Sequence, residues 1–377
     1  MSAAVGSQRL RFAHVFATFG RGGPQVRAVQ LMQHLGDTVE HVVMAMDGCT
    51  DAAGMLDDNT RERVSFASPP PLARGGFGAM RKAQRAWLRT VQPNLVLTYN
   101  WGSIETVAAA RSARLPLVHH EDGFGPEEAS KRLLRRSLFR RWLLRKVPVV
   151  VPSTVLSAIA KDEWGVRDAS LHHLVNGVDL ERFAPRARAG DDAFDAAALA
   201  QDAFVLGSVG GLRPEKDHHN LLHALTRLPA NVVAVIVGSG ALEGDLHALV
   251  TQFELDDRVV FAGHTNDTAA SYARFDAFVL SSRTEQMPIA MLEAMACGLP
   301  VVATDVGDVR RVLPSEPDPM VVPREDADAL AAGVLRVLED PELRRQLGQA
   351  NRQTVEERYE ATACLERFAQ LYRDCAR

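Results

Sequence analysis

The stretch from Ser281 to Pro300, SSRTEQMPIAMLEAMACGLP, decides the expected fold. An apolar run ends just before it at Leu280, and a second one, Pro300–Ala303, follows it at once. Between them the pattern predicts a helix that opens at Pro288 and stops at Gly298, because proline is tolerated in the first turn and glycine favours the position past the end. Strand, helix and strand in this order indicate a parallel sheet covered by helices.

Two glutamates of this stretch are candidate ligand-binding residues. Glu285 lies on the loop before the helix, and Glu293 lies about a turn and a half inside it. Ionised carboxylates accept hydrogen bonds from neighbouring hydroxyls such as those of a sugar ring or a ribose, and the helix N-terminus favours a phosphate. The alternative is that both glutamates simply face solvent.

The same alternation of apolar runs and helical patterns extends over the whole chain in two series. Helices are expected between the strands, for example at Asn220–Leu228 and Leu242–Leu249, and Arg182–Ala200 has no sustained period and predicts a linker. The expected strands are Phe12–Thr18, Glu40–Met46, Leu95–Tyr99, Pro116–His119 and Val147–Val151 in the first series, and Phe204–Val209, Val232–Val237, Arg258–Phe261, Ala277–Leu280, Pro300–Ala303 and Met320–Val322 in the second.

The expected fold class is therefore α/β, with two Rossmann-like domains that face each other across an inter-domain cleft. The first domain takes residues 1–183 and the second residues 184–361, with a C-terminal helix at about 362–377 that packs back on the first. Ligands of such sheets bind at the carboxyl ends of the strands, so the cleft is the expected site.

Composition excludes several classes of protein. The chain has 377 residues, 46% of them hydrophobic, and 43 Lys+Arg against 47 Asp+Glu give a formal net charge of -4. These values exclude a disordered chain and a protein that binds nucleic acid over most of its surface. The four cysteines show no CxxC spacing, which argues against a zinc site or a disulfide framework. Without a signal-like apolar run or a membrane-spanning stretch, a cytoplasmic protein is expected.

Glycine-rich turns after three expected strands are candidates for contact with a phosphate. Val209–Asp217, VGGLRPEKD, places Gly211 beside two cations, Arg213 and Lys216, that suit a diphosphate. The FGRGGPQ turn after the first strand offers Gly22 and Gly23, and Gly238 begins a GSG turn. Each of these turns, taken alone, is better explained as a solvated or tight turn.

A group of titratable residues follows another strand of the first domain. His119, His120 and Asp122 stand where the cleft is expected, so each is a candidate for proton transfer or for holding a sugar hydroxyl. A structural role for the two histidines is the alternative, and no further His or Cys at ligand spacing supports a metal site. The only DxD pattern, Asp326–Asp328, opens a helix and is interpreted as a cap.

Taken together, these elements resemble the retaining GT-B glycosyltransferases of family 4, the group 1 glycosyltransferases, over nearly the whole chain. The motif that carries the resemblance is the pair Glu285 and Glu293, with seven residues between them, inside EQMPIAMLEAMACGLPVVATDVGDVRRV at 285–312. Asn176–Phe183, NGVDLERF, resembles the family's segment at the domain junction. The GGLRPEK run, the GSG turn and the GGPQ loop occur in the family's order.

The resemblance implies a role for each candidate. Glu285 is expected to contact the donor sugar, Glu293 the nucleotide ribose and Lys216 the diphosphate. Arg213 is expected to supply the guanidinium that the family carries at the position of Gly211. The remaining implied contacts are the backbone of Met287, Pro288 and Ile289 with the sugar, Gly22 and Gly23 with the diphosphate or the acceptor, Gly238 with the donor, and a residue near the reacting carbon chosen among His119, His120 and Asp122, with His120 slightly favoured.

The function implied by the resemblance is transfer of a sugar from a nucleotide diphosphate sugar, with UDP the expected nucleotide, to a saccharide or lipid-linked saccharide in bacterial surface polysaccharide or lipopolysaccharide synthesis. No metal or other cofactor and no nucleic-acid partner is expected. A front-side mechanism, in which the leaving phosphate takes the acceptor's proton, is preferred. Two alternatives remain: an isomerase similar to a UDP-N-acetylglucosamine 2-epimerase, and a non-catalytic protein that binds sugar nucleotides.

The segment from Lys131 to Lys146 stands apart because it holds eight cations and no acid in sixteen residues. Leu134, Leu138 and Trp142 recur in it at four-residue spacing. One interpretation is peripheral contact with an anionic membrane that carries the acceptor. The other is a packed helix with a solvated basic face. The loop Ser68–Gly78 and the basic helix after it are candidates for receiving an acidic acceptor.

Overall fold

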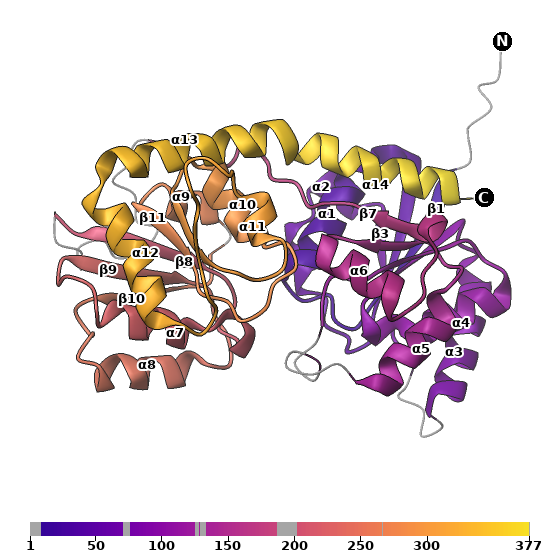
Figure 1. Cartoon of the computed structure of the whole chain (residues 1–377). Helices are drawn as coiled ribbons and strands as arrows, with labels where there is room; N and C mark the ends of the chain where they lie inside the picture. The colour runs from indigo at the N-terminus through magenta and orange to yellow at the C-terminus, as the bar shows by residue number, and fades with distance from the viewer. Residues whose placement is uncertain are drawn as a thin grey trace, which may run out of the picture. The chain divides into compact units, whose positions relative to one another are not determined.

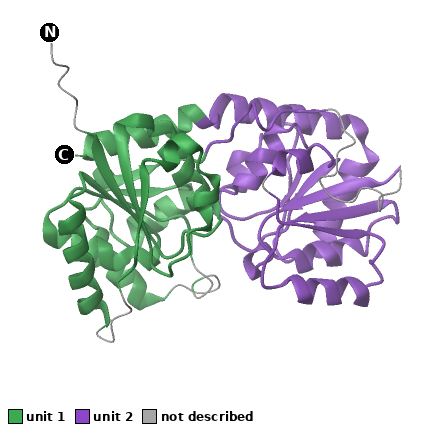
Figure 2. Ribbon diagram, turned by 180° about the vertical axis from the view of Figure 1, so that it is seen from behind, with its two compact units in different colours: residues 1–176, 362–377 green, residues 177–361 purple. Residues whose placement is uncertain are grey.

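The computed structural model describes residues 9–70, 76–124, 128, 133–186, 202–265 and 267–376. The chain forms two compact units, which Figure 2 distinguishes by colour: unit 1 comprises residues 1–176 and 362–377, and unit 2 comprises residues 177–361. Part of the expected linker, residues 187–200, and the loop residues 71–75 lie outside the described residues.

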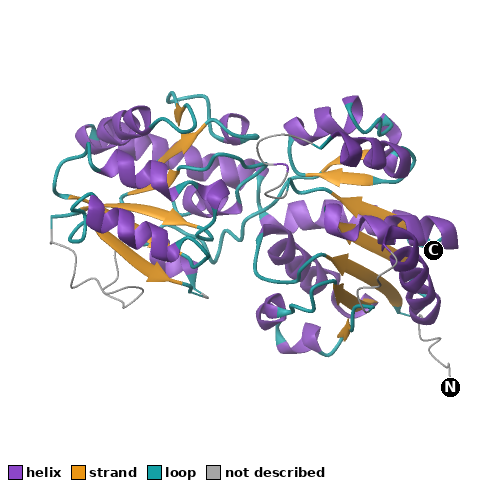
Figure 3. Cartoon of the chain, turned by 90° about the horizontal axis from the view of Figure 1, so that it is seen from below, coloured by secondary structure: helices purple, strands orange, loops and turns teal. Residues whose placement is uncertain are grey.

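Unit 1 is built on a parallel sheet of seven strands in the order β3-β2-β1-β4-β5-β6-β7. Helices cover both of its faces (Figure 3). The strands are β1 Leu10–Phe16, β2 Val39–Ala45, β3 Val64–Ala67, β4 Leu95–Tyr99, β5 Leu117–His120, β6 Val149–Val151 and β7 Leu171–His173. The helices are α1 Gly23–Leu35, α2 Asp58–Arg61, α3 Gly76–Val91, α4 Ile104–Ala113, α5 Leu134–Leu144, α6 Thr154–Asp162 and, from the far end of the chain, α14 Ala361–Cys375.

Unit 2 repeats the plan with six parallel strands in the order β10-β9-β8-β11-β12-β13. Its interior strand β9 reads VVAVIV and is buried at every position, as a strand covered by helices on both faces requires. The strands are β8 Phe204–Val209, β9 Val232–Val237, β10 Val259–Gly263, β11 Ala277–Leu280, β12 Val301–Thr304 and β13 Met320–Val322. The helices are α7 His218–Leu225, α8 Glu243–Gln252, α9 Thr268–Tyr272, α10 Ile289–Ala296, α11 Val309–Val312, α12 Ala327–Glu339 and α13 Pro341–Arg358, labelled in Figure 1.

The predicted α/β class with two Rossmann-like domains is confirmed, and eleven of the strands match the expected ones within about two residues. Strands β3 and β7 were not predicted from the sequence. They form the two edges of the unit 1 sheet. An edge strand is short and half-exposed, so it lacks the continuous apolar run that marks a central strand of a parallel sheet.

Helix α14 supplies part of the core of unit 1. Phe368 and Tyr372 are buried there among side chains of β1, β4 and α1. The ring of Phe12 on β1 packs edge-on against Tyr372, with 6.2 Å between the centroids. The hydrophobic core of unit 1 therefore depends on two segments that are far apart in the sequence.

None of the described helices is long and apolar enough to cross a membrane. The four cysteines are all free.

Candidate active site

In unit 2 the strand order brings β8 and β11 together, although the chain continues from them toward opposite edges of the sheet. The loops after two such strands lie beside each other at the carboxyl edge, where parallel α/β sheets bind ligands. Lys216 ends the turn after β8, and Glu285 lies on the loop after β11. The Lys216 Nζ lies 2.5 Å from Glu285 Oε1, so the structure brings these two predicted residues into one ion pair.

Hydrogen bonds to neighbouring loops hold the Glu285 loop in this place. Ser282 Oγ donates to Glu285 Oε1 over 2.9 Å, and Thr304 at the end of β12 donates to the Ser282 carbonyl over 2.6 Å. Gly307 lies so close behind the loop that a Cβ atom there would come within 2.3 Å of the Glu285 carbonyl oxygen. The Glu285 side chain is only 13% exposed. The alternative, in which this glutamate simply faces solvent, therefore does not apply to it.

A third loop closes against the turn after β8. Gly238, which follows β9, has a φ of 145°, a conformation that side chains disfavour. A Cβ atom on it would lie 2.0 Å from the Gly210 carbonyl oxygen. Only glycine fits here, and its role in the described structure is the close approach of two backbone segments.

The Arg213 side chain covers Gly211. A Cβ atom built on Gly211 would lie 3.2 Å from Arg213 Nε, so the guanidinium extends over the position where a side chain at 211 would begin. Arg213 is 58% exposed, and its nearest described acidic partner, Glu215, is 4.0 Å away. The site therefore presents one cation inside an ion pair, Lys216, and one on the surface, Arg213.

Helix α10 carries the second glutamate. Pro288 is the capping residue immediately before Ile289, one position earlier than the expected place inside the helix, and Met287 and Pro288 are both buried. Glu293 is partly buried, and the Tyr272 hydroxyl lies 2.8 Å from its Oε2 and 2.9 Å from the Ala290 carbonyl. Burial raises the pKa of Glu293 to about 7, against the lowering effect of the Tyr272 hydrogen bond.

In unit 1, an ion pair ties the loop after β5 to the first turns of α1. Arg27 donates to both carboxylate oxygens of Asp122, over 2.6 and 2.9 Å, and to Asn176 Oδ1 over 3.0 Å. Gly22 caps α1 and Gly23 is its first residue. The predicted glycine loop and Asp122 are thus connected through Arg27.

His119 and His120 lie inside unit 1, and both are 0% exposed. His119 contacts Thr98 Oγ1 through Nδ1 at 2.8 Å and Glu121 Oε1 through Nε2 at 3.4 Å. His120 Nε2 accepts from the Tyr372 hydroxyl over 2.8 Å, if its Nδ1–H donates to the Thr98 carbonyl. Burial lowers the pKa of His120 well below its usual value. This geometry favours the structural alternative for both histidines, and among the three candidates only Asp122 has exposed surface.

The described residues contain no group of three or more His, Cys, Asp or Glu side chains placed to hold a metal ion. The DxD pattern serves the role expected for it, because Asp326 caps α12 by accepting from the Ala329 amide over 2.8 Å.

Comparison with known proteins identifies the family of the chain. The family model "Glycosyltransferase Family 4" matches residues 21–182, and "Glycosyl transferases group 1" matches residues 191–354. A GDP-mannose-dependent alpha-(1-6)-phosphatidylinositol monomannoside mannosyltransferase of Mycolicibacterium smegmatis is 30% identical over 288 residues, which are 71% of both chains. The chain belongs to the group 1 glycosyltransferases, family 4. Within this family, a UDP-Gal:alpha-D-GlcNAc-diphosphoundecaprenol alpha-1,3-galactosyltransferase of Escherichia coli is also 30% identical, over 246 residues.

The chain spans 62% of the length of that Escherichia coli relative. Among solved structures, Anabaena HepE in complex with UDP and glucose superposes on 96% of this family 4 chain and 99% of its own, with a TM-score of 0.82 and 19% identity. This likeness confirms the GT-B fold.

Ser282, Tyr272 and Arg27 are among the residues of the site that were not predicted from the sequence. Ser282 stands three residues before Glu285 in the quoted stretch, and Arg27 stands four residues after Gly23, so both could have been suspected from their distance to a candidate. Tyr272 lies 21 residues from Glu293, and no local pattern connects them.

Proposed function

We propose that this protein is a retaining glycosyltransferase that moves a sugar from a nucleotide diphosphate sugar to a saccharide or lipid-linked saccharide acceptor in the synthesis of a bacterial surface glycan. The observation that carries the proposal is the Lys216–Glu285 ion pair where the strand order of unit 2 reverses. It places a cation for a diphosphate and a carboxylate for sugar hydroxyls within one hydrogen bond of each other, in a chain whose family transfers sugars.

Each candidate residue of unit 2 has a proposed role in donor binding. Lys216 and Arg213 bind the diphosphate, Glu285 accepts hydrogen bonds from the donor sugar, and Glu293 accepts them from the ribose. The backbone of Met287–Ile289 faces the sugar, and Gly238 allows the donor close to the main chain. The Escherichia coli relative, a UDP-Gal-dependent transferase, and the HepE complex with UDP support UDP as the nucleotide. The Mycolicibacterium smegmatis relative is GDP-mannose-dependent, so GDP is the second nucleotide to test.

The chemistry follows from where charge develops. As the bond between the sugar and the phosphate breaks, positive charge builds on the ring and negative charge on the leaving nucleotide. Lys216 and Arg213 stabilise that negative charge as it grows, and such stabilisation is commonly the largest single contribution to catalysis. In the front-side reaction the acceptor oxygen bonds to the same face of the carbon, and its proton passes to the leaving phosphate oxygen. A double displacement needs a carboxylate nucleophile beneath the ring, and the proposal assigns none.

In unit 1, Asp122 and the glycine loop at Gly22 and Gly23 are the proposed acceptor-side groups. The Arg27 ion pair holds Asp122 beside the start of α1. His119 and His120 support this loop from within the unit, and a direct contact of His120 with the reacting sugar stays a prediction. Substitution of Asp122 by Asn should raise the KM for the acceptor and leave donor affinity unchanged.

Calorimetric titration with UDP-, GDP- and ADP-sugars tests the donor site. We expect one nucleotide to bind, and Lys216→Ala to weaken that binding by about 10- to 100-fold, because a hydrogen bond to a charged group is lost. The double variant K216A/E285Q separates that loss from repulsion by the unpaired Glu285. Equal affinity of wild type and K216A for every nucleotide sugar contradicts the proposed donor site.

Moving the arginine tests whether Arg213 replaces the side chain missing at Gly211. Arg213→Ala should weaken donor binding, and the double variant G211R/R213A should restore most of it, since the Arg213 side chain now covers Gly211. Arg336→Ala on an exposed face of α12 is the matched control. If G211R/R213A binds no better than R213A, the guanidinium of Arg213 does not take the proposed place.

The reaction class is tested with the donor that binds. Retention predicts that the anomeric configuration of the product, read by NMR, equals that of the donor. Conversion of the nucleotide sugar to its epimer without acceptor would support the isomerase alternative instead, and unchanged glycan output in cells that carry K216A and E285A would support a non-catalytic role. Full activity after chelation of divalent metal is the expected result for a metal-independent enzyme.

A further inference from the structure

Helix α5 exposes an apolar stripe to solvent and buries one of its arginines. Leu134, Leu138 and Trp142 form one stripe along it and are 81%, 67% and 62% exposed, whereas Arg140 is 1% exposed. Surface helices of soluble proteins normally turn the apolar stripe toward the core and the charges toward water. Helix α5 also has the packed side and the solvated cations that the alternative interpretation expects, because Leu143 and Leu144 are buried and Arg135 and Arg141 are exposed. The exposed apolar stripe is the feature that this alternative leaves unexplained. Lys131 and Arg132 of the basic segment lie outside the described residues.

The contacts of Arg140 explain why the helix cannot rotate the stripe inward. Its Nε donates to Glu121 Oε1 over 2.7 Å, and its Nη1 lies 3.3 Å from Glu128 Oε2. The guanidinium also lies 5.0 Å from the ring centres of both Trp101 and Trp164. Leu143 and Leu144 are buried on the same side. The outward position of the stripe is thus fixed by a buried ion pair and aromatic contacts.

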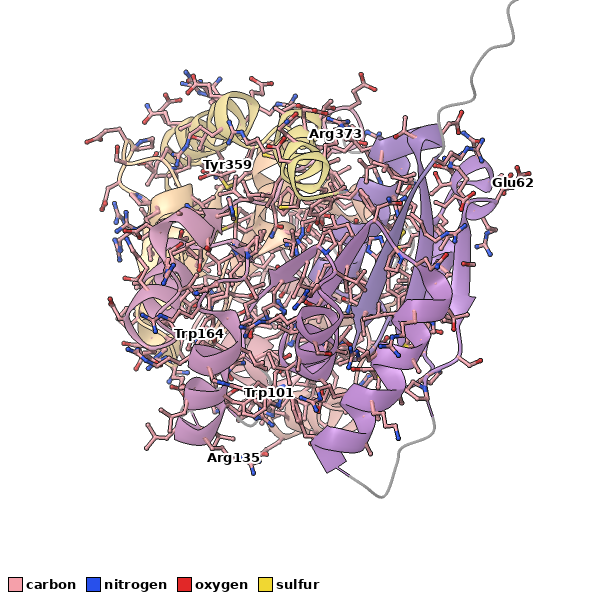
Figure 4. The ribbon with its side chains drawn as sticks, turned by 90° about the vertical axis from the view of Figure 1, so that its right-hand side faces the viewer. Glu62, Trp101, Arg135, Trp164, Tyr359 and Arg373 are labelled. Carbon is pink, nitrogen blue, oxygen red and sulfur yellow. The ribbon has the colours of Figure 1, made fainter. Side chains whose placement is uncertain are left out.

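The exposed charged residues of α5 and of its C-terminal end have one sign. Arg135, Arg141, Arg145 and Lys146 are exposed, and the helix and its end contain no acidic residue. Figure 4 shows Arg135 at the outer edge of the molecule, with Trp101 and Trp164 further in. An apolar stripe bordered by cations is the pattern of a helix that lies in the interface of a membrane.

A basic pocket opens beside the stripe. It has a volume of about 410 Å³ and lies between the end of α5 and the end of α6. Four of its lining residues are cationic and one is acidic: Arg141, Arg145, Lys161, Arg167 and Asp168. The Arg141 side chain is held over Gly165, where a Cβ atom would meet its Nη1 at 3.3 Å. The pocket has the charge to hold a phosphate group next to side chains able to enter the acyl region.

We propose that α5 and this pocket form a docking surface for an anionic phospholipid membrane. Leu134, Leu138 and Trp142 enter the boundary between headgroups and acyl chains, and Arg141 and Arg145 bind a lipid phosphate in the pocket. The inference concerns a partner other than the donor and stands independently of the transferase activity. It also fits a lipid-linked acceptor, because the surface belongs to unit 1, the proposed acceptor side.

A second copy of this chain fits the surface less well than a membrane. A two-fold contact through the stripe brings the same patch of both copies together. The cations that border the stripe in one copy would then face those of the other. An anionic lipid surface instead meets both features at once, with apolar area for the stripe and negative charge for the border.

Flotation of the full chain with vesicles tests the proposal without any sugar present. Binding is expected with vesicles of phosphatidylglycerol and phosphatidylcholine and not with phosphatidylcholine alone. R141Q/R145Q should lower the partition coefficient by about 10- to 30-fold, and Leu138→Ser by about tenfold. Arg336→Gln and Phe66→Ser, an exposed cation and an exposed apolar residue on other elements, are the matched controls and should bind like wild type.

Fluorescence identifies the stripe directly. On vesicle binding the tryptophan emission should shift to shorter wavelength, and Trp142→Phe should abolish the shift while keeping the binding. Equal binding to neutral vesicles, unchanged binding of L138S, or loss of binding in R336Q to the same extent as in R141Q/R145Q would each overturn the proposal. So would a concentration-dependent dimer that L138S dissociates. Circular dichroism of each variant shows that its fold is intact.

Discussion

We expect the affinity of the protein for a nucleotide sugar to rise as the pH is raised through neutrality, because Glu293 ionises in that range. Burial raises its pKa to about 7. Only the ionised carboxylate accepts a hydrogen bond from each of two ribose hydroxyls. For a single group of this pKa the ionised fraction, and with it the affinity, increases about tenfold between about pH 6 and about pH 8.

The assay is calorimetric titration with UDP-glucose, or with whichever nucleotide sugar the donor screen selects. The diphosphate of a nucleotide sugar has no group that titrates near neutrality, so the slope reports on the protein. Glu293→Gln has the same shape and does not titrate. It should bind with one affinity over the whole range, close to that of wild type at low pH and weaker at high pH. A Glu293→Gln profile with the slope of wild type would refute the assignment.

Stability gives an independent reading of the same pKa. The native pKa of Glu293 is raised from the usual 4.5 to about 7, so the folded state holds its proton more firmly than the unfolded state does. The stability that this proton confers is complete below the unfolded pKa and is lost as the pH rises to the native one. The Tm of wild type should therefore fall relative to that of E293Q between about pH 4.5 and about pH 7, and a constant difference would contradict the raised pKa.

Three further results are expected. Tyr272→Phe removes a hydrogen bond that lowers the pKa of Glu293, so the pH at which donor affinity is half-maximal should move upward, and an unchanged midpoint would show that the tyrosine does not position the carboxylate. Gly238→Ala places a Cβ 2.0 Å from a carbonyl oxygen and should lower the Tm by more than about 4 °C, whereas Gly244→Ala on the exposed face of α8 should not lower it. Arg140→Ala leaves Glu121 and Glu128 without their buried partner and should cost about 3–5 kcal/mol in the free energy of unfolding by urea, against little change for the exposed Arg141→Ala.

The fold was predictable because the central strands of both sheets are continuous apolar runs bounded by turn residues. The same regularity located Lys216 and Glu285, since each follows such a strand. Their contact was not predictable from spacing, because 69 residues separate them and only the strand order brings β8 beside β11.

Long-range contacts also explain why the role of the two histidines and the orientation of α5 could not be predicted from the sequence. The two histidines after β5 were candidates for chemistry, and their burial depends on Thr98 from β4 and Tyr372 from α14. The orientation of α5 could not be derived from its own pattern, which favours an inward apolar stripe. Glu121 and Glu128 bind Arg140 inside the unit and so leave the stripe of Leu134, Leu138 and Trp142 in solvent.

The position of helix α14 at the C-terminal end of the chain affects the order in which the two units fold during translation. Phe368 and Tyr372 complete the core around β1, and the Tyr372 hydroxyl contacts His120. All of unit 2 is translated before these two residues. Until α14 is synthesised, residues 1–176 of unit 1 leave part of their apolar core exposed to solvent. Unit 2 is continuous in the sequence and can fold as soon as it has left the ribosome. Chaperone capture of nascent chains should accordingly be strongest for lengths that end between the two segments of unit 1, and a C-terminal deletion should harm the amino-terminal half of the protein first.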